Sequence, residues 1–245
     1  MSVPPELQGR LHGMGDAVKA AEMAAYHKTD RSFLGVPALL LDEMARDLRR
    51  GMTLPERLET AQALWNSDTH EGRILAAKLL TQARIRPDDT PVWDMIVAWV
   101  PQFDSWALAD HVAIAGAKRL QAVPARLNEV ETWTTDSNLW VRRAALVMTL
   151  PWARLAHPKA ADLAVRERVL GWAAGYVEDR DRFIQKAVAW WLRDLSRRDP
   201  ARVRAFLDGP GAALTQAART EAERLMGPGA PGDQVSEPQS QSSGF

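Results

Sequence analysis

Asp110 is a carboxylate in a stretch of sequence that is otherwise typical of a buried helix. The residues around it, DSWALADHVAIAGA from Asp104, are apolar on nearly every side of a helical wheel, and Trp106 lies one turn before Asp110 on the same face. A desolvated carboxylate without a partner is costly, so Asp110 must be paired, act as a cap or serve a function. The pattern leaves two interpretations open. Asp110 is bound to a helix terminus or to an arginine such as Arg143, or it stabilises a positive charge.

A second candidate is the aromatic and cationic pair in FIQKAVAWWLR. On a helical wheel Ile184, Val188 and Trp191 form an apolar stripe, which places Arg193 opposite the stripe and Trp190 away from its centre. An indole and a guanidinium three residues apart on a helix surface can hold a nucleotide or a peptide. The other interpretation is that Trp190 packs against a neighbouring repeat.

A local surplus of positive charge covers the segment from Asp179 to Arg204, although the whole chain balances at 31 basic and 31 acidic side chains. A surplus of this kind can follow a phosphate backbone, because phosphate neutralisation dominates nucleic-acid affinity. A solvated helix face is the alternative. The bases are Arg180, Arg182, Lys186, Arg193, Arg197, Arg198, Arg202 and Arg204, and the acids are Asp179, Asp181, Asp194 and Asp199.

Helices must position these residues. Before Gly227, apolar residues recur at helical spacing in segments of about 10 to 16 residues, and no convincing β alternation is present. Prolines separate the segments at positions 37, 55, 87, 91, 101, 124, 151, 158 and 200. The spacing predicts an all-α protein.

The helical segments also repeat. DSNLWVRRAAL from Asp136 and DRDRFIQKAVA from Asp179 align without a gap at an offset of 43 residues, and DTHEGRILAAKLL from Asp68 is a looser third copy. An acid, an aromatic residue, a base and then small residues suit a short turn, an N-cap Asp and a closely packed helix. A period of this length indicates an α-solenoid of HEAT-like repeats, whose usual product is a concave binding surface.

Composition excludes several other chemistries. The chain has no cysteine, which excludes disulfides, thiolate nucleophiles and cysteine metal sites. The two GPGA segments at Gly209 and Gly227 lack the Lys-Ser/Thr of a phosphate-binding loop. We expect no metal site, because the histidines lack the spacing and the company of metal ligands, although His111 could support the neighbouring Asp110. The histidines are His12, His27, His70, His111 and His157.

The ends of the chain suggest its organisation. The first residues have no apolar signal region, and no apolar run approaches the roughly 18 residues of a membrane span, so we expect a cytoplasmic protein without a membrane partner. Residues 1–226 are predicted to form one helical repeat domain, expected to be a monomer. Residues 227–245 are rich in Gly, Pro, Ser and Gln and are predicted to be a disordered tail.

Three blocks in this order resemble a known family. The set Trp106-x-x-x-Asp110, LWVRRAA and FIQKAVAWWLR is similar to the alkylpurine DNA glycosylases built from HEAT-like repeats, the bacterial AlkD family. YHKTDRSFLGVPALLLDEMARDL, from Tyr26, is similar to the family's opening, and the resemblance extends to about Leu207. Where the family often has an aromatic residue before the Trp and an acid after it, this chain has Ser105 and Ala107.

The resemblance implies hydrolysis of the N-glycosidic bond of cationic N3- and N7-alkylated purines in double-stranded DNA, without a metal or cofactor. It implies that Asp110 is the catalytic carboxylate and that Trp106 and Trp190 line the cleft. Arg143 and Arg193 would hold phosphates, as would Lys186 of the third block. It also implies a bacterial protein that lies on the nucleoid when bound to DNA.

The expected chemistry agrees with these roles, because alkylation already makes the purine a good leaving group and positive charge develops on the deoxyribose. A carboxylate about 4 Å from that charge contributes on the order of 4 kcal/mol at an effective dielectric of 20. The alternative function is a non-catalytic HEAT-repeat module that binds DNA structures or a protein partner and in which Asp110 is structural.

Overall fold

A computed structural model describes residues 2–226, and within this range the regular secondary structure is helical, with a single isolated β-bridge between Ser32 and Thr69. The α-helices are α1 (Pro5–Gly13), α2 (Ala17–His27), α3 (Ala38–Gly51), α4 (Leu54–Asn66), α5 (His70–Leu80), α6 (Thr90–Trp99), α7 (Trp106–Ala122), α8 (Leu127–Thr132), α9 (Leu139–Met148), α10 (Leu150–Arg154), α11 (Ala160–Gly175), α12 (Arg182–Ser196), α13 (Pro200–Asp208) and α14 (Gln216–Glu223). Short 3-10 helices are η1 (Val100–Gln102), η2 (Pro124–Arg126), η3 (Trp133–Thr135) and η4 (Pro210–Ala213).

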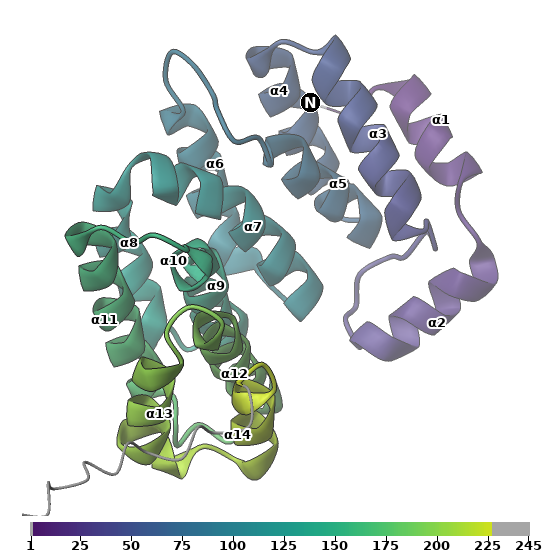
Figure 1. Ribbon diagram of the computed structural model, residues 1–245. Coiled ribbons are helices and arrows are strands. Elements are labelled where there is room, and N and C mark those ends of the chain that lie inside the picture. Colours follow the sequence, from purple (N-terminus) through teal and green to yellow (C-terminus); the bar gives the residue numbers. More distant parts are fainter. Residues whose placement is uncertain (1, 227–245) are drawn as a thin grey trace, which may run out of the picture.

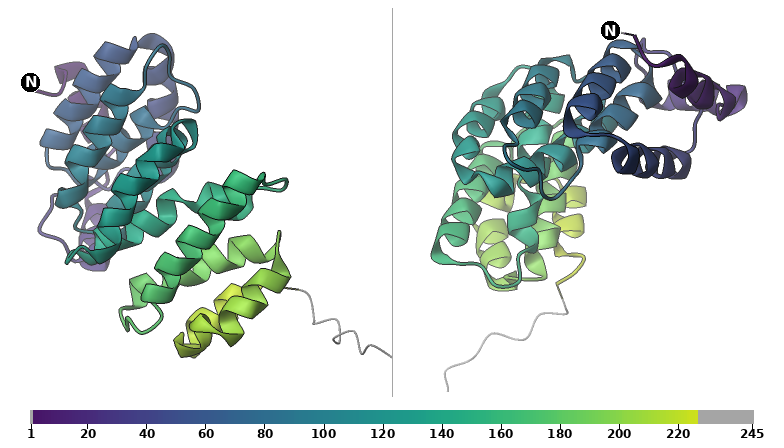
Figure 2. Two further views of the ribbon diagram at one scale, coloured as in Figure 1. Left: turned by 90° about the vertical axis from the view of Figure 1, so that its left-hand side faces the viewer. Right: turned by 90° about the horizontal axis from the view of Figure 1, so that it is seen from above.

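The helices form a curved stack of pairs. The second helices of successive pairs pack against one another in the order α5, α7, α9, α12 and α14, and they make the inner layer of the curve (Figures 1 and 2). Helices α4, α6, α8, α11 and α13 lie on the outer side (Figure 1). The predicted all-α solenoid is therefore confirmed.

The repeat length differs along the stack. The N-caps of the inner helices are Thr69, Ser105, Asn138, Asp181 and Thr215, so successive inner helices begin 36, 33, 43 and 34 residues apart. The 43-residue offset seen in the sequence applies to α9 and α12 and is wrong as a general period, because α10 and a long α11 are inserted between them.

The acids predicted to be N-caps, Asp136 and Asp179, lie two residues before the true N-caps. Asp136 and Asp179 do not cap α9 and α12; each accepts a hydrogen bond from the backbone N–H two residues later, at 2.7 and 2.9 Å. Those later residues, Asn138 and Asp181, are the N-caps. Each copy thus has an acid that forms a tight turn directly before the capping residue.

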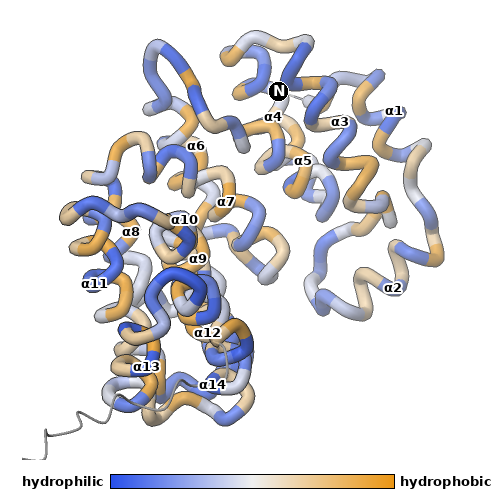
Figure 3. Tube along the Cα trace, viewed as in Figure 1, coloured by the Kyte–Doolittle hydropathy of each residue, from blue (hydrophilic) through white to orange (hydrophobic). Residues whose placement is uncertain are grey.

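Tryptophans build much of the core between the layers. Seven of the ten are buried, and the rings of Trp65 and Trp99 stack with centroids 4.3 Å apart. Figure 3 shows hydrophobic residues interspersed with hydrophilic ones along the helices, as expected when one face of each helix is buried. The three half-buried tryptophans are Trp106, Trp140 and Trp190, which all lie on inner helices.

The loop after α2 is held by a buried carboxylate. Glu71, which is fully buried in the first turn of α5, accepts hydrogen bonds from the backbone N–H groups of Leu34, Gly35 and Val36 at 2.9, 2.7 and 3.3 Å. Gly35 has a φ of 75°, and a Cβ there would lie 2.1 Å from the carbonyl oxygen of Asp16. The FLGV sequence therefore needs its glycine to wrap around Glu71.

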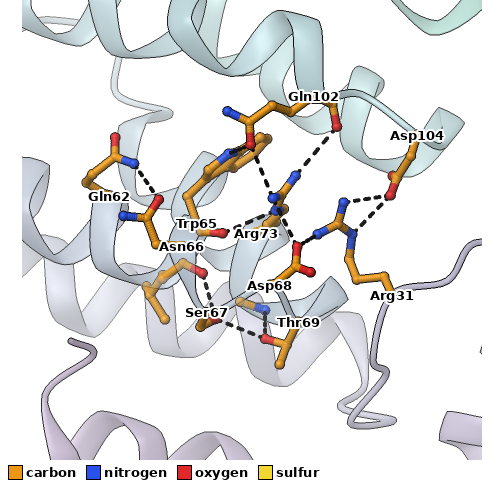
Figure 4. A network of polar contacts seen from close by, with 12 residues as sticks. Arg31, Gln62, Trp65, Asn66, Ser67, Asp68, Thr69, Arg73, Gln102 and Asp104 are labelled. Atoms are coloured by element: carbon orange, nitrogen blue, oxygen red, sulfur yellow. Dashed lines mark hydrogen bonds and ion pairs between the residues drawn. The ribbon is translucent and has the colours of Figure 1, made fainter. Parts of the chain in front are cut away.

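A polar network ties this loop to the start of α7. The Arg31 guanidinium binds Asp68 and donates two hydrogen bonds to Asp104 Oδ2, at 3.1 and 2.6 Å (Figure 4). Arg73 donates to Asp68 Oδ1 at 3.0 Å and to the Trp65 carbonyl at 3.1 Å. Because Asp104 precedes the N-cap of α7, the network fixes the helix end that carries Trp106.

The predicted tail at 227–245 lies outside the described residues. Within residues 2–226, each helix is too short or too polar to cross a membrane.

Candidate functional site

Asp110 and Arg143 form a buried, two-pronged ion pair between α7 and α9. Arg143 Nε and Nη2 donate to the two carboxylate oxygens of Asp110, both at 2.8 Å, and only 7% of Asp110 and 6% of Arg143 is exposed. The third nitrogen, Nη1, donates to the Phe183 carbonyl at the start of α12, also at 2.8 Å. Three successive inner helices are therefore joined through Arg143, and the pairing of Asp110 with this arginine is what one of its two interpretations predicts.

Local sequence explains how the pair can form. Ser105 caps α7 by accepting the Leu108 N–H at 3.5 Å, so the residue that departs from the family's usual pattern has a structural use here. Asp110 follows in the second turn of α7, and Arg143 occupies the second turn of α9. Both helices carry small buried residues near the pair, which lets their backbones approach closely. These residues are Ala107, Ala109, Ala113, Ala144 and Ala145.

Trp106 faces an apolar pocket on the N-terminal side of Asp110. Its ring stacks on His27 with centroids 5.5 Å apart and meets the edge of Tyr26 at 6.4 Å. The pocket has a volume of about 370 Å³, and its lining also includes His70 and His111. Trp106 and Trp190 therefore line different pockets.

Burial favours the uncharged form of the three histidines around Trp106, which are His27, His70 and His111, and it lowers the pKa of each. The pKa of His70 is lowered to about 3, mainly by burial and to a smaller extent by the neighbouring His27 and His111. Burial also lowers the pKa of His111, whose Nδ1 bonds to the Ala107 carbonyl oxygen at 2.8 Å and not to Asp110. Within residues 2–226, no group of three or more His, Asp or Glu side chains could hold a metal ion.

The larger pocket lies between α12 and α14 and is strongly basic. Its volume is about 610 Å³, and it brings together four of the side chains expected at the site, namely Arg143, Lys186, Trp190 and Arg193. Asp110 does not line the pocket itself, but its ion-pair partner Arg143 does. The remaining lining residues are Arg180, Arg182, Gln185, Ala189, Thr215, Ala217, Ala218 and Glu221.

The bases of this pocket differ in how they are neutralised. Among the described residues, no carboxylate lies within ion-pair distance of Arg180, Arg182 or Lys186, and all three are exposed. Arg182 lies over the Phe183 ring, 4.6 Å from its centroid. Arg193, in contrast, is bound by Glu221 and lies 3.3 Å from Asp194 Oδ1.

The chain matches a protein-family model over most of its length. The model described as DNA alkylation repair enzyme matches residues 7–226. The chain belongs to this family. A search of curated proteins gives no match.

Solved structures share the fold of this family member. A predicted DNA alkylation repair enzyme from Enterococcus faecalis is 21% identical, with a TM-score of 0.71 over 87% of this chain and 97% of its own. AlkD2 from Streptococcus mutans is 19% identical, with a TM-score of 0.56 over 77% and 88%. The protein smu.31 from Streptococcus mutans UA159 is 18% identical, with a TM-score of 0.56 over 76% and 90%. At these identities the likeness establishes the fold.

Several residues at the site of this DNA alkylation repair family member were not singled out from the sequence. Arg180 and Arg182 belong to the basic run from Asp179 to Arg204. The run alone could not single them out, because it also includes Arg202, which binds Glu167 on the outer side and does not line the pocket. Glu221 carries no sequence signal, because its importance comes from contact with Arg193, 28 residues away. Tyr26 and His27 belong to the site because their rings contact Trp106.

Proposed function

We propose that this protein is a DNA glycosylase that hydrolyses the N-glycosidic bond of cationic N3- and N7-alkylated purines in duplex DNA, acting as a single chain without a metal or cofactor. One observation carries the proposal: a buried carboxylate, Asp110, is fixed beside a basic pocket that contains a half-buried tryptophan. Membership of the DNA alkylation repair enzyme family supports the same reaction class.

The position of Asp110 suits stabilisation of a cationic transition state. Its partner Arg143 lines the basic pocket, and Trp106, one turn away on α7, lines the apolar pocket. Asp110 is thus connected to both tryptophans expected at the cleft, to Trp106 along α7 and to Trp190 through Arg143. As the C–N bond breaks, positive charge develops on the deoxyribose and the neutral purine leaves, so no general acid is required. The carboxylate stabilises that charge and orients the attacking water.

Arg143 has a double role in this scheme. Two of its nitrogens hold both carboxylate oxygens of Asp110, and this geometry fixes the direction in which the carboxylate faces. The guanidinium has five N–H groups and uses three of them within the protein, so two remain for a DNA phosphate. Its positive charge also opposes the developing cation, and this reduces the net stabilisation.

The proposed DNA surface is the basic pocket together with the exposed start of α12. Lys186, Arg180 and Arg182 supply exposed positive charge and form no ion pair among the described residues. Trp190 offers an indole face, which stacks on a base or attracts a cationic one. A locally basic surface on a chain with 31 bases and 31 acids predicts DNA binding that is modest and falls steeply with salt.

The Asp110–Arg143 pair also supports a second candidate, a non-catalytic HEAT-repeat module that binds DNA structures or a protein partner. In that function the pair joins α7, α9 and α12 and does no chemistry. The two functions differ in whether any base is released from DNA.

The deciding experiment measures release of free base from duplex DNA that contains N7-methylguanine or N3-methyladenine, with EDTA present throughout. An unmodified duplex is the substrate control, and spontaneous release without protein is subtracted. Release above this background, from alkylated DNA only, supports the glycosylase. Binding of the same duplexes without release supports the binding module, and EDTA-sensitive release would contradict the metal-free mechanism.

The docking surface is tested separately by the Lys186→Ala variant. Loss of one phosphate contact flattens the plot of log binding constant against log salt concentration by about 0.9. Arg50→Ala is the control, because Arg50 is also an exposed base but lies on α3, where it pairs with Asp47, and does not line the basic pocket. Equal effects of the two substitutions would contradict the proposed surface.

A further inference from the structure

Glu221 is the one acid among the side chains of residues 2–226 that line the basic pocket, and it binds Arg193, a base of the pocket that the proposed function assigns to DNA. Arg193 Nη1 donates to Glu221 Oε1. The side chains of Arg193 and Glu221 are 20% and 34% exposed, so the pair lies at the mouth of the pocket and not in the core. A DNA phosphate that bound Arg193 would compete with Glu221 for Nη1 and for the charge of the guanidinium.

Helix α14 is firmly docked, so Glu221 does not reach Arg193 by chance. The backbone N–H of Thr215, the N-cap of α14, donates to Gln185 Oε1 at 3.0 Å, and its hydroxyl lies 3.1 Å from the same oxygen. Gln185 itself is buried in α12, and Ala218 and Ala222 bury one face of α14 against the stack. The carboxylate of Glu221 is therefore presented at a fixed position opposite Arg193.

We infer that Glu221 is an intramolecular competitor of DNA phosphate. In the free protein its carboxylate occupies Arg193, and on binding a backbone phosphate replaces it. This inference rests on the proposed function, because it assumes that DNA enters the basic pocket. The consequence is a weaker hold on DNA than the bases of the pocket would otherwise give.

The other contacts of Arg193 make Glu221 the decisive competitor. Asp194 Oδ1 lies 3.4 Å from Arg193 Nε and 3.3 Å from Nη2, which are long contacts, and Asp194 Oδ2 accepts a shorter hydrogen bond of 2.7 Å from Arg154. Removal of Glu221 therefore frees Nη1 while Nε and Nη2 stay loosely held. Glu221 Oε2 also lies 3.3 Å from Nε of Arg224, an exposed base.

The test is binding of an unmodified fluorescent duplex by Glu221→Gln, measured by anisotropy over a range of salt concentrations. One additional charge-assisted phosphate contact predicts binding about tenfold tighter at low salt. It also predicts a salt dependence that is steeper by about 0.9 in the slope of log binding constant against log salt. Glu221→Ala serves as a second variant, and thermal unfolding verifies that α14 stays folded in both.

Two controls isolate the contact. Glu223→Gln removes the same charge from the same helix, but Glu223 pairs with Arg219 at 3.2 Å and not with Arg193. It is expected to change affinity little. In an Arg193→Gln background, Glu221→Gln is expected to change affinity no more than Glu223→Gln does, because Arg193 is absent and the only base freed is the exposed Arg224.

The outcomes separate the inference from the function on which it rests. Equal gains from Glu221→Gln and Glu223→Gln, or a gain that persists without Arg193, would overturn the competition and leave the glycosylase proposal intact. Failure of every variant and the wild type to bind DNA would overturn both. Base release by the wild type is measured independently and does not depend on the affinity comparison.

Discussion

Replacing Asp110 with asparagine is expected to slow base release by about 10³, and removing Arg143 as well is expected to restore part of the rate. The reason is that the two members of the ion pair act on the developing sugar cation with opposite sign. They are locked together by two 2.8 Å hydrogen bonds, so neither charge can move away from the other.

The magnitudes follow from Coulomb's law. A carboxylate about 4 Å from the cation contributes roughly 4 kcal/mol at an effective dielectric of 20, whereas a guanidinium about 8 Å away opposes it by roughly 2 kcal/mol. The wild-type pair therefore gives a net of about 2 kcal/mol. Asp110→Asn removes the favourable part alone, which is worth about 10³ in rate. Asp110→Asn with Arg143→Met removes both, so the double variant should be about 30-fold slower than wild type and about 30-fold faster than Asp110→Asn.

Stability must be followed in the same variants. Breaking a buried ion pair by removing one partner costs about 3–5 kcal/mol, whereas replacing both partners with uncharged groups is often close to neutral. Asp89→Asn is the matched control, because Asp89 is also buried and binds Arg119 at the other end of α7, at 3.1 Å. It should lower the unfolding free energy without slowing base release.

The assay is single-turnover release of N7-methylguanine at saturating protein, with rates expressed per folded molecule from circular dichroism at the assay temperature. Saturation removes the contribution of Arg143 to DNA affinity. A double variant no faster than Asp110→Asn would refute the opposition of charges. An unchanged rate in folded Asp110→Asn would refute the catalytic assignment of Asp110.

Two further predictions concern stability. His70 is buried with a pKa lowered to about 3, whereas in the unfolded chain it takes up a proton below about pH 6.5; the stability that it contributes is therefore complete above pH 6.5 and lost as the pH falls towards 3. Between pH 8 and pH 5 the free energy of unfolding, measured with urea, should fall by about 2 kcal/mol less in His70→Phe than in wild type. An equal fall in the two proteins would contradict this. Glu71→Gln should lower the unfolding free energy by about 2–4 kcal/mol, because three backbone N–H groups lose a charged acceptor. The exposed Glu22→Gln is its control in the same urea titration, and equal stability of the two variants would show that the FLGV turn does not depend on Glu71.

The fold and the site differ in how far the sequence could predict them. Apolar spacing and prolines predicted helices correctly, because helix periodicity is a local property of the chain. The aligned segments from Asp136 and Asp179 located two real inner helices, but their 43-residue offset could not reveal the shorter spacing elsewhere. That spacing depends on whether α10 and a long α11 are present, and no residue within the aligned segments encodes this.

The sequence by itself determined the class of this protein and the residues that stand out in it: Asp110 among apolar residues, Trp190 off its apolar stripe, and a basic run beginning near Arg180. Residue type and helical phase are enough for these conclusions. Only the tertiary structure decided which charges meet. Asp110 is joined to Arg143, 33 residues away, and Arg193 is joined to Glu221, 28 residues away, because successive repeats bring the inner helices side by side. Electrostatic contacts depend on distances of a few ångströms, and the chain fixes those distances only when it folds.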